Sequence, residues 1–105
     1  AQAEIVWGNS PFVTYNDLTL TPLIFENSKA FAEVVETLPS TGGEDFATYQ
    51  KEIPGVFAFI GSNGDDDAAD WHHDDFLVKD EALPVAVNYY VENALFLLDY
   101  FKDNH

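Results

Sequence analysis

The chain has 105 residues and a formal net charge of −15, because it contains 19 acidic residues and only 4 lysines. This length is normally one domain, and a content of 47% hydrophobic and 15% aromatic residues excludes a wholly disordered chain. The negative charge argues against binding to nucleic acid or an anionic membrane surface, and no apolar stretch is long enough to span a bilayer. The absence of cysteine excludes disulfides and thiolate ligands, and leads us to expect a cytoplasmic location.

The first half of the chain is predicted to contain a strand and a helix. Residues 3–7 (Ala-Glu-Ile-Val-Trp) favour a short strand because a Gly-Asn-Ser-Pro turn follows them. Thr21 and Pro22 are typical of a helix start, with a hydroxyl at the N-cap and a proline in the first turn. Apolar residues then recur at helical spacing, which predicts a helix over residues 21–37.

The second half is predicted to contain a short helix, a buried strand and a long helix. Residues 45–52 fit a short helix that Pro54 must end. Residues 56–60 (Val-Phe-Ala-Phe-Ile) are all apolar, which is typical of a strand buried on both faces. Residues 81–103 fit a long amphipathic helix, with Pro84 tolerated near the first turn. The predicted buried stripe of that helix consists of Ala82, Leu83, Ala86, Val87, Tyr90, Val91, Ala94, Leu95, Leu98 and Phe101.

This order of elements predicts an α/β fold with a sheet that is incomplete within the chain. A strand buried on both faces needs a neighbouring strand on each side. The other predicted strand, residues 3–7, can supply only one of them. We therefore expect a larger sheet, either because the chain is a fragment or because a second copy pairs with it as a homo-oligomer.

Two of the three histidines, His72 and His73, lie in an acidic loop after the predicted strand 56–60. In open α/β sheets, ligands bind beyond the carboxyl ends of the strands, where this loop would lie. Neutral imidazole is the commonest protein ligand of transition metals, and a catalytic zinc has about three protein ligands. The pair is therefore either one arm of a metal site, with one of the two side chains ligating, or two exposed loop histidines.

Glu44 and Asp45 follow two glycines at the predicted start of the short helix. A carboxylate at this position satisfies free backbone N–H groups and complements the helix dipole, and Asp45 fits that role. Glu44 is then a candidate metal ligand, a residue that orients a ligand, or a general base.

A loop rich in aspartate, with Asp65, Asp66, Asp67 and Asp70, offers a second candidate site. Calcium binds clustered carboxylates, but the loop lacks the alternating acidic positions and the closing Glu of an EF-hand. A solvated acidic loop is the simpler interpretation. A self-standing acidic module that binds calcium or a partner is the alternative function.

Four segments of the chain match motifs of one known family, in its order and at about its spacing. They are Gly43-Glu44-Asp45-Phe46-Ala47-x-Tyr49, Ile53-Pro54-Gly55-Val56-Phe57-Ala58-Phe59-Ile60-Gly61, His72-His73-x-x-Phe76 and Asp80-Glu81-Ala82-Leu83-Pro84. The set resembles the metal-dependent amidohydrolases, a family of aminoacylases, hippurate hydrolases and auxin-conjugate hydrolases that is related to the zinc carboxypeptidases. The resemblance covers essentially the whole chain, and it is to the C-terminal part of the family's catalytic domain.

The resemblance implies a domain organisation and site residues. Residues 1–11 would end an inserted lid domain, and residues 12–105 would form the C-terminal portion of a zinc-exopeptidase-like α/β catalytic domain. His72 falls on the family's C-terminal metal ligand. Glu44 and Asp45 fall on an acidic pair near the metal centre. His73 falls on a variable neighbouring position, and Asp74 stands where the family often has proline.

The resemblance also implies an activity, the hydrolysis of the amide bond of N-acyl amino acids or small peptides. The implied cofactors are two divalent metal ions, of zinc, manganese or cobalt. The family's other metal ligands and its general base come from a Cys-and-His cluster, a Glu-Glu pair and a further His, and this sequence contains none of these motifs. We therefore expect this chain alone to bind no metal tightly and to be inactive.

Overall fold

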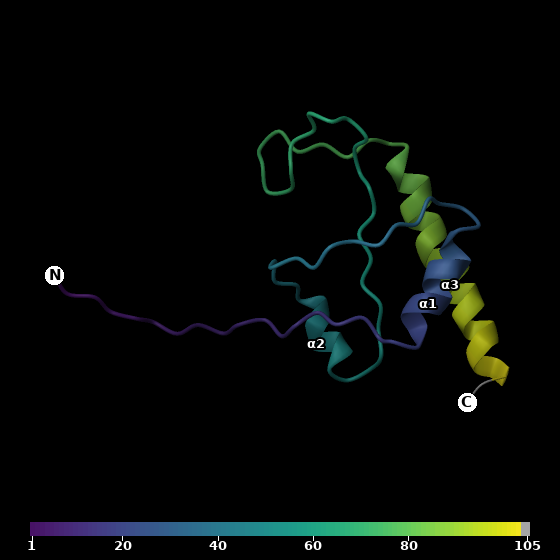
Figure 1. Cartoon of the computed structure of the whole chain (residues 1–105), viewed down its shortest axis with the longest axis horizontal. Helices are drawn as coiled ribbons and strands as arrows, with labels where there is room; N and C mark the ends of the chain where they lie inside the picture. Colours follow the sequence, from purple (N-terminus) through teal and green to yellow (C-terminus); the bar gives the residue numbers. More distant parts are fainter. Residues whose placement is uncertain (104–105) are drawn as a thin grey trace.

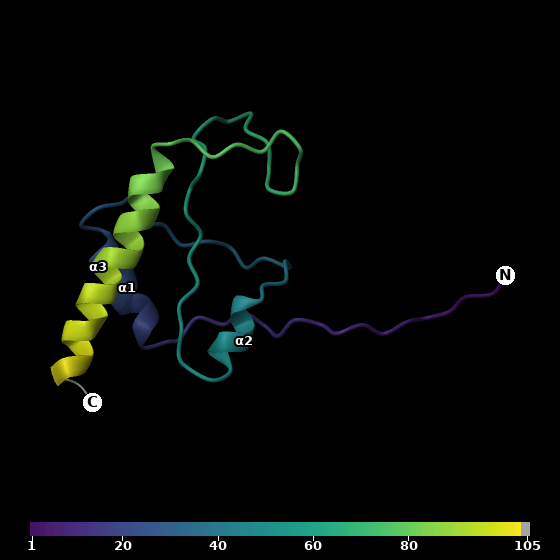
Figure 2. The ribbon, with the colours of Figure 1, turned by 180° about the vertical axis from the view of Figure 1, so that it is seen from behind.

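The computed structural model describes residues 1–103, so residues 104 and 105 of the predicted catalytic portion lie outside the described part. It contains three α-helices, α1 (Leu20–Ser28), α2 (Phe46–Gln50) and α3 (Ala82–Asp103). Figure 1 shows α1 and α3 packed together, with α2 lying apart from them. Residues 1–11 run away from the helices as an extended segment (Figures 1 and 2). No helix of the described part is both long and apolar enough to cross a membrane.

The described chain is open rather than compact. Its Cα radius of gyration is 17.4 Å, whereas a compact domain of about this length has a value of about 13 Å. Its accessible surface is 9142 Å², whereas about 5,900 Å² is expected for a folded monomer of this mass. Much of the excess surface is apolar, as at Trp7, which is 89% exposed. Such a surface is typical of a chain that packs against further protein.

Neither predicted strand forms within residues 1–103. Residues 3–7 are exposed, and residues 56–60 form an extended thread between α2 and the following loop (Figure 1). A strand needs a ladder of backbone hydrogen bonds to a neighbour, and the described residues provide no neighbour for either segment. At Phe57 the Asn16 carboxamide makes the two hydrogen bonds that the backbone of a neighbouring strand would make. It accepts from the Phe57 N–H (2.8 Å) and donates to the Phe57 carbonyl (2.9 Å). The α/β class is therefore not confirmed by the described residues.

Helix α1 begins at Leu20 because the side chain of Asp17 caps it. The Asp17 Oδ1 accepts hydrogen bonds from the backbone N–H groups of Thr19 (2.9 Å) and Leu20 (2.8 Å). A carboxylate that satisfies free N–H groups at this end of a helix stabilises it. The predicted cap, Thr21, is instead inside the first turn, where its hydroxyl donates to the Asp17 carbonyl (2.6 Å).

Helix α1 ends at Ser28, so the prediction that it continues to residue 37 is wrong. The N–H groups of Lys29 and Ala30 bond to carbonyls three residues back, at 3.3 Å each, which tightens the last turn. Beyond it Val35 is 66% exposed. Apolar spacing alone does not maintain a helix in water, because most helical stability comes from packing of the apolar face.

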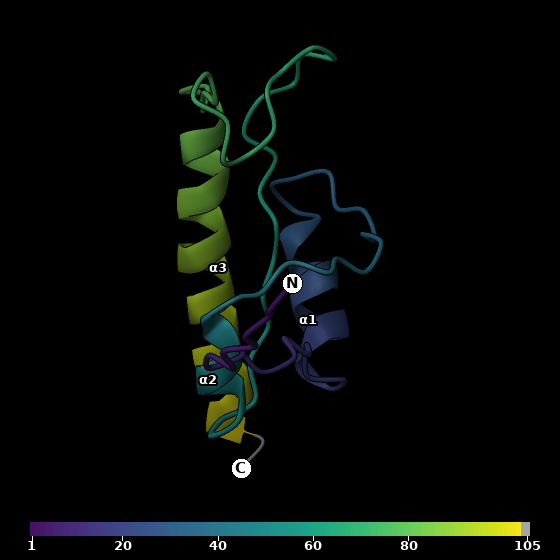
Figure 3. The ribbon, with the colours of Figure 1, turned by 90° about the vertical axis from the view of Figure 1, so that its left-hand side faces the viewer.

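Asn93 is the centre of the contact between α1 and α3, which lie beside each other in Figure 3. Its Nδ2 donates to the Ser28 Oγ (3.0 Å) and to the Tyr89 carbonyl (2.9 Å), and its Oδ1 accepts from the Asn27 Nδ2 (2.9 Å). Asn93 and Ser28 are both 5% exposed, so these bonds satisfy polar groups that water cannot reach. Burial, and secondarily the neighbouring Tyr90, raise the pKa of the Tyr89 hydroxyl.

Helix α3 has the predicted bounds to within one residue, but its predicted buried stripe is wrong. The face that turns toward α1 carries Tyr89 and Asn93. On the predicted stripe Tyr90 is 74% exposed and Leu98 is 71% exposed. The apolar residues at helical spacing therefore form a face of α3 other than the one that packs on α1. Most of this apolar face is exposed within residues 1–103.

Candidate functional site

The histidine loop, residues 62–79, is closed at its base by two hydrogen bonds. The Lys79 N–H donates to the Ser62 carbonyl (2.8 Å), and the Lys79 Nζ pairs with the Asp65 Oδ1 (2.8 Å). Between these points the chain makes successive turns, one of them closed by the His73 N–H and the Asp70 carbonyl at 3.3 Å. The loop is therefore held at its base and shaped by turns, with no helix or strand inside it.

His72 is the one described non-glycine residue with a positive φ, at 66°. It occupies the third position of the turn from Asp70 to His73, where some β-turn types require such a backbone. An L-residue in this left-handed region is uncommon, although histidine is enriched there compared with most side chains. His72 and His73 are both exposed, so each imidazole is accessible from outside the loop.

Glu44, not Asp45, is the carboxylate that bonds to the start of α2. The Glu44 Oε1 accepts from the backbone N–H of Phe46 at 3.2 Å. Asp45 occupies the N-cap position, but its side chain makes no capping hydrogen bond and is exposed. The expectation that Asp45 caps the helix is therefore wrong, and Asp45 is the carboxylate left for another role.

A chain of ring contacts connects the start of α2 with the histidine loop. The ring centroids of Phe46 and Phe57 are 5.8 Å apart, those of Phe57 and Phe59 are 5.4 Å apart, and those of Phe59 and Trp71 are 5.3 Å apart. The Trp71 ring then lies 6.2 Å from the imidazole of His72. Each aromatic pair at such a distance contributes about 0.5–1.5 kcal/mol beyond its buried area. We call Phe46, Phe57, Phe59 and Trp71 the aromatic row.

Two amide side chains, Asn16 and Gln50, fix the segment that begins this row. Besides the two bonds from Asn16 to Phe57, the Gln50 Nε2 donates to the Gly55 carbonyl (3.1 Å) and its Oε1 accepts from the Tyr15 N–H (3.0 Å). Neither amide was predicted from the sequence to have a role. An isolated amide in a sequence gives no signal of a backbone partner about 40 residues away.

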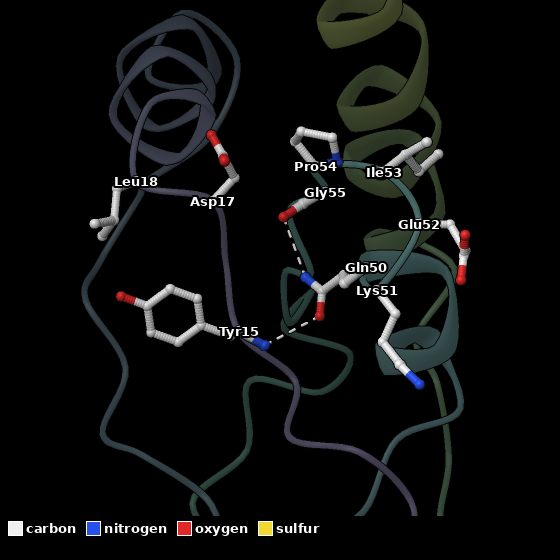
Figure 4. A pocket seen from close by; sticks show the side chains of 9 residues that line it. All are labelled: Tyr15, Asp17, Leu18, Gln50, Lys51, Glu52, Ile53, Pro54 and Gly55. Atoms are coloured by element: carbon white, nitrogen blue, oxygen red, sulfur yellow. Dashed lines mark hydrogen bonds between the residues drawn. The ribbon is translucent and has the colours of Figure 1, made fainter.

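A shallow pocket of about 390 Å³ lies beside this amide pair (Figure 4). Tyr15, Asp17, Gln50 and Gly55 are among the residues that line it. Figure 4 shows the Gln50 carboxamide bonded to backbone atoms on both sides, so its polar atoms are used for structure. Neither Glu44, Asp45 nor His72 lines the pocket, which separates it from the predicted site residues.

Gly43, next to Glu44, lies against the end of the extended N-terminal segment. A Cβ atom at position 43 would be 2.8 Å from the Cγ of Pro11, closer than such atoms approach in real structures. The segment with the candidate carboxylates is thus in contact with the last residue of the predicted lid portion.

The model for Peptidase family M20/M25/M40 matches residues 1–95 of the chain. The chain belongs to this family. The amidohydrolase resemblance inferred from the motifs is confirmed by this match.

Three relatives support membership in Peptidase family M20/M25/M40. The chain is 40% identical over 99 residues to an N-acetyl-L-cysteine deacetylase of Bacillus subtilis (strain 168), covering 93% of this chain and 23% of that protein. It is 39% identical over 103 residues to an N-acetylcysteine deacetylase of the same organism, covering 97% of this chain and 26% of that protein. It is 36% identical over 88 residues to the IAA-amino acid hydrolase ILR1-like 5 of Arabidopsis thaliana, covering 81% of this chain and 19% of that protein. The chain thus spans about a quarter of the length of the two deacetylases. Its family and these relatives show that the chain is part of a hydrolase. No solved structure matches the chain.

The M20 family generally uses divalent metal ions. Within residues 1–103 no three His, Cys, Asp or Glu side chains come together as a group that could hold a metal ion. His72 has suitable donor chemistry, but the described residues do not complete a site around it. The aspartate loop gathers no such group either, and its Asp65 is paired with Lys79. The geometry therefore offers no support for the calcium alternative.

Proposed function

We propose that this chain is the C-terminal part of the catalytic domain of a metal-dependent hydrolase that cleaves the amide bond of N-acyl amino acids or small peptides. The observation that carries the proposal is the backbone of His72, the residue that the motifs align with a family metal ligand. A positive φ at a histidine costs free energy, and such conformations cluster at functional sites. The exposed imidazole supports a role in binding something outside the loop.

In the complete enzyme, His72 would be one ligand of a divalent ion of zinc, manganese or cobalt. Such an ion polarises a carbonyl oxygen when it is bound. Asp45 would border the site with a free carboxylate, and Glu44 would hold the start of α2 through its bond to Phe46. His73 would be a neighbour without a ligand role.

We further propose that residues 1–11 end a lid domain and that residues 12–105 complete an α/β catalytic domain in a cytoplasmic enzyme. The extended course of residues 3–7 and 56–60 supports this arrangement, because both segments could pair with strands outside the chain. The exposed apolar surface supports it as well, since further protein would cover Val87, Leu95 and Leu98.

The test is a comparison of His72→Ala with His73→Ala in the complete protein. We expect His72→Ala to lower the bound-metal content measured by elemental analysis, and to lower the hydrolysis of N-acetylcysteine at least 100-fold. His73→Ala should keep both within about threefold of the unchanged protein, because adjacent side chains point in different directions. Full metal content and activity in His72→Ala would contradict the proposed ligand role.

The isolated 105-residue chain should be inactive on the same substrate. A catalytic metal site needs about three protein ligands, and residues 1–103 bring no three suitable side chains together. Hydrolysis by the purified chain above the rate of a His72→Ala control would contradict this expectation.

A further inference from the structure

We propose that the aromatic row positions His72 relative to the start of α2, and that Trp71 is the positioning residue at the end of the row. This inference rests on the proposed function, because it concerns the side chain that would be the ligand. It assigns a role to aromatic residues that otherwise have no part in the chemistry.

The row joins the two segments that carry the candidate site residues. It starts at Phe46, whose N–H is bonded to the Glu44 carboxylate, and it ends at Trp71, the residue before His72. Consecutive ring centroids are 5.3–5.8 Å apart, distances at which aromatic pairs attract each other. Segments about 25 residues apart in sequence are thereby held in a fixed relation.

The start of the row is anchored firmly. Phe57 is held through both of its backbone polar groups by Asn16. Phe46 lies against Gly55, where an added Cβ would be 3.2 Å from the Phe46 Cζ. A ring that packs closely against backbone on one side has little freedom to move, so Phe59 and Trp71 extend from a fixed base.

At the far end of the row, the Trp71 ring connects the histidine loop to Phe59. The loop is bonded at its base, between Ser62 and Lys79. Away from the base, the Trp71 ring contacts Phe59, and the backbone turns at His72 with its φ of 66°. Without the Trp71 ring, the base bonds and local turns would remain, but the direction of the His72 imidazole would no longer be tied to the row.

Within residues 1–103 the pair at the end of the row, Phe59 and Trp71, is only about half buried. Phe59 is 48% exposed and Trp71 is 54% exposed, so their contact removes only part of their apolar surface from water. A core contact gains stability in proportion to the apolar area it buries. The place of this pair, directly before His72, fits orientation of the imidazole, and the two substitutions at Trp71 distinguish that role from a stabilising one.

The experiment compares Trp71→Ala, Trp71→Phe and Trp7→Ala in the complete protein. The first readout needs no metal: the imidazole resonances of His72 in heteronuclear NMR spectra, assigned by their loss in His72→Ala. We expect Trp71→Ala to shift them, because the ring 6.2 Å away is lost, and to broaden them, because the imidazole then exchanges between several orientations. Trp71→Phe should keep them narrow, and Trp7→Ala should leave them unchanged, since no ring contact in the described part of the chain joins Trp7 to His72 or to the aromatic row.

The second readout is the affinity for cobalt(II), followed by its visible absorption. Residues that orient a metal ligand typically change metal affinity 10- to 100-fold when removed. We expect a loss of about that size in Trp71→Ala, recovery to within about threefold in Trp71→Phe, and a thermal midpoint close to that of the unchanged protein in both.

The outcomes separate the two proposals. If His72→Ala abolishes cobalt binding but Trp71→Ala changes neither the cobalt affinity nor the His72 resonances, the positioning role is wrong and the proposed function stands. If His72→Ala leaves cobalt binding unchanged, the ligand role is wrong, and the NMR comparison alone decides whether Trp71 orients the imidazole. Equal losses in Trp71→Ala and Trp71→Phe would also overturn the proposal, because the conservative ring should rescue a positioning role.

Discussion

The contact between α1 and α3 and the histidine loop are built in opposite ways. The helix contact is centred on Asn93, which is 5% exposed and whose hydrogen bonds join two helices distant in sequence. The histidine loop is exposed, is closed at its base by Ser62 and Lys79, and returns to the rest of the chain through one ring contact. In this chain buried polar bonds therefore hold the two helices together, whereas the candidate ligand lies on an exposed segment that is held at its base and by one ring contact.

The largest expected effect comes from the centre of the helix contact. Asn93→Ala removes the buried carboxamide that bonds to the Ser28 hydroxyl, and leaves the Asn27 amide only its longer bond to the Glu92 carbonyl (3.4 Å). We expect the free energy of unfolding to fall by about 1–3 kcal/mol, measured by urea denaturation of the chain followed by circular dichroism. Asn88→Ala is the matched control, because Asn88 is an exposed residue of the same helix and should change stability by less than about 0.5 kcal/mol. Equal effects of the two substitutions would show that the buried bonds of Asn93 do not stabilise the helix contact.

The next effect concerns the start of α1, which positions one side of the helix contact. Asp17→Ala removes the carboxylate that accepts from the N–H groups of Thr19 and Leu20. Loss of such a cap typically costs about 1 kcal/mol, and the same urea titration would measure it. Asp17→Asn keeps an oxygen acceptor and should recover most of the loss. If Asp17→Ala left the free energy of unfolding unchanged, the cap would not contribute to the stability of the chain.

A smaller effect is expected at the base of the histidine loop. The Lys79 Nζ and the Asp65 carboxylate are about half exposed, and exposed ion pairs contribute about 0–1 kcal/mol. Lys79→Met should therefore lower the free energy of unfolding by less than 1 kcal/mol, and the difference should vanish in high salt because salt screens the pair. A loss that persists at 1 M salt would show that the ion pair is not the cause.

The smallest effect is expected at His72 itself. His72→Gly removes the imidazole but relieves the left-handed backbone, which glycine adopts without steric cost. We expect the free energy of unfolding to stay within about 0.5 kcal/mol of the unchanged chain, since relief of strain and the added freedom of the unfolded chain oppose each other. His72→Val is the control, because a β-branched residue is poorly accommodated at a positive φ and should destabilise the loop. If both variants were equally stable, the backbone at His72 would carry no strain.

Several parts of this structure could be predicted from the sequence because they depend on local signals. The long helix has the predicted bounds because its apolar spacing, its proline near the first turn and its length all agree. The family could be recognised because four motifs occur together in order. His72 was singled out by those motifs, and the structure adds a backbone feature at the same residue.

Other parts could not be predicted because they depend on partners distant in sequence. The apolar run 56–60 resembles a strand, but pairing requires a neighbour that the described residues do not provide. The stripe through Tyr90 and Leu98 has the correct period, but periodicity does not reveal what covers a face. Asn93 lies on the polar face of the amphipathic pattern, where nothing in the sequence marks it as the buried centre of a contact.

The close approach of Gly43 to Pro11 has a consequence for how this sequence can vary. A methyl group at position 43 would meet the Pro11 ring at 2.8 Å, and a proline ring has little freedom to move away. Any side chain at 43 therefore requires a different residue at 11, or a displaced N-terminal segment. In a collection of related sequences the two positions should change together, and a larger residue at 43 should occur only where the proline at 11 is absent.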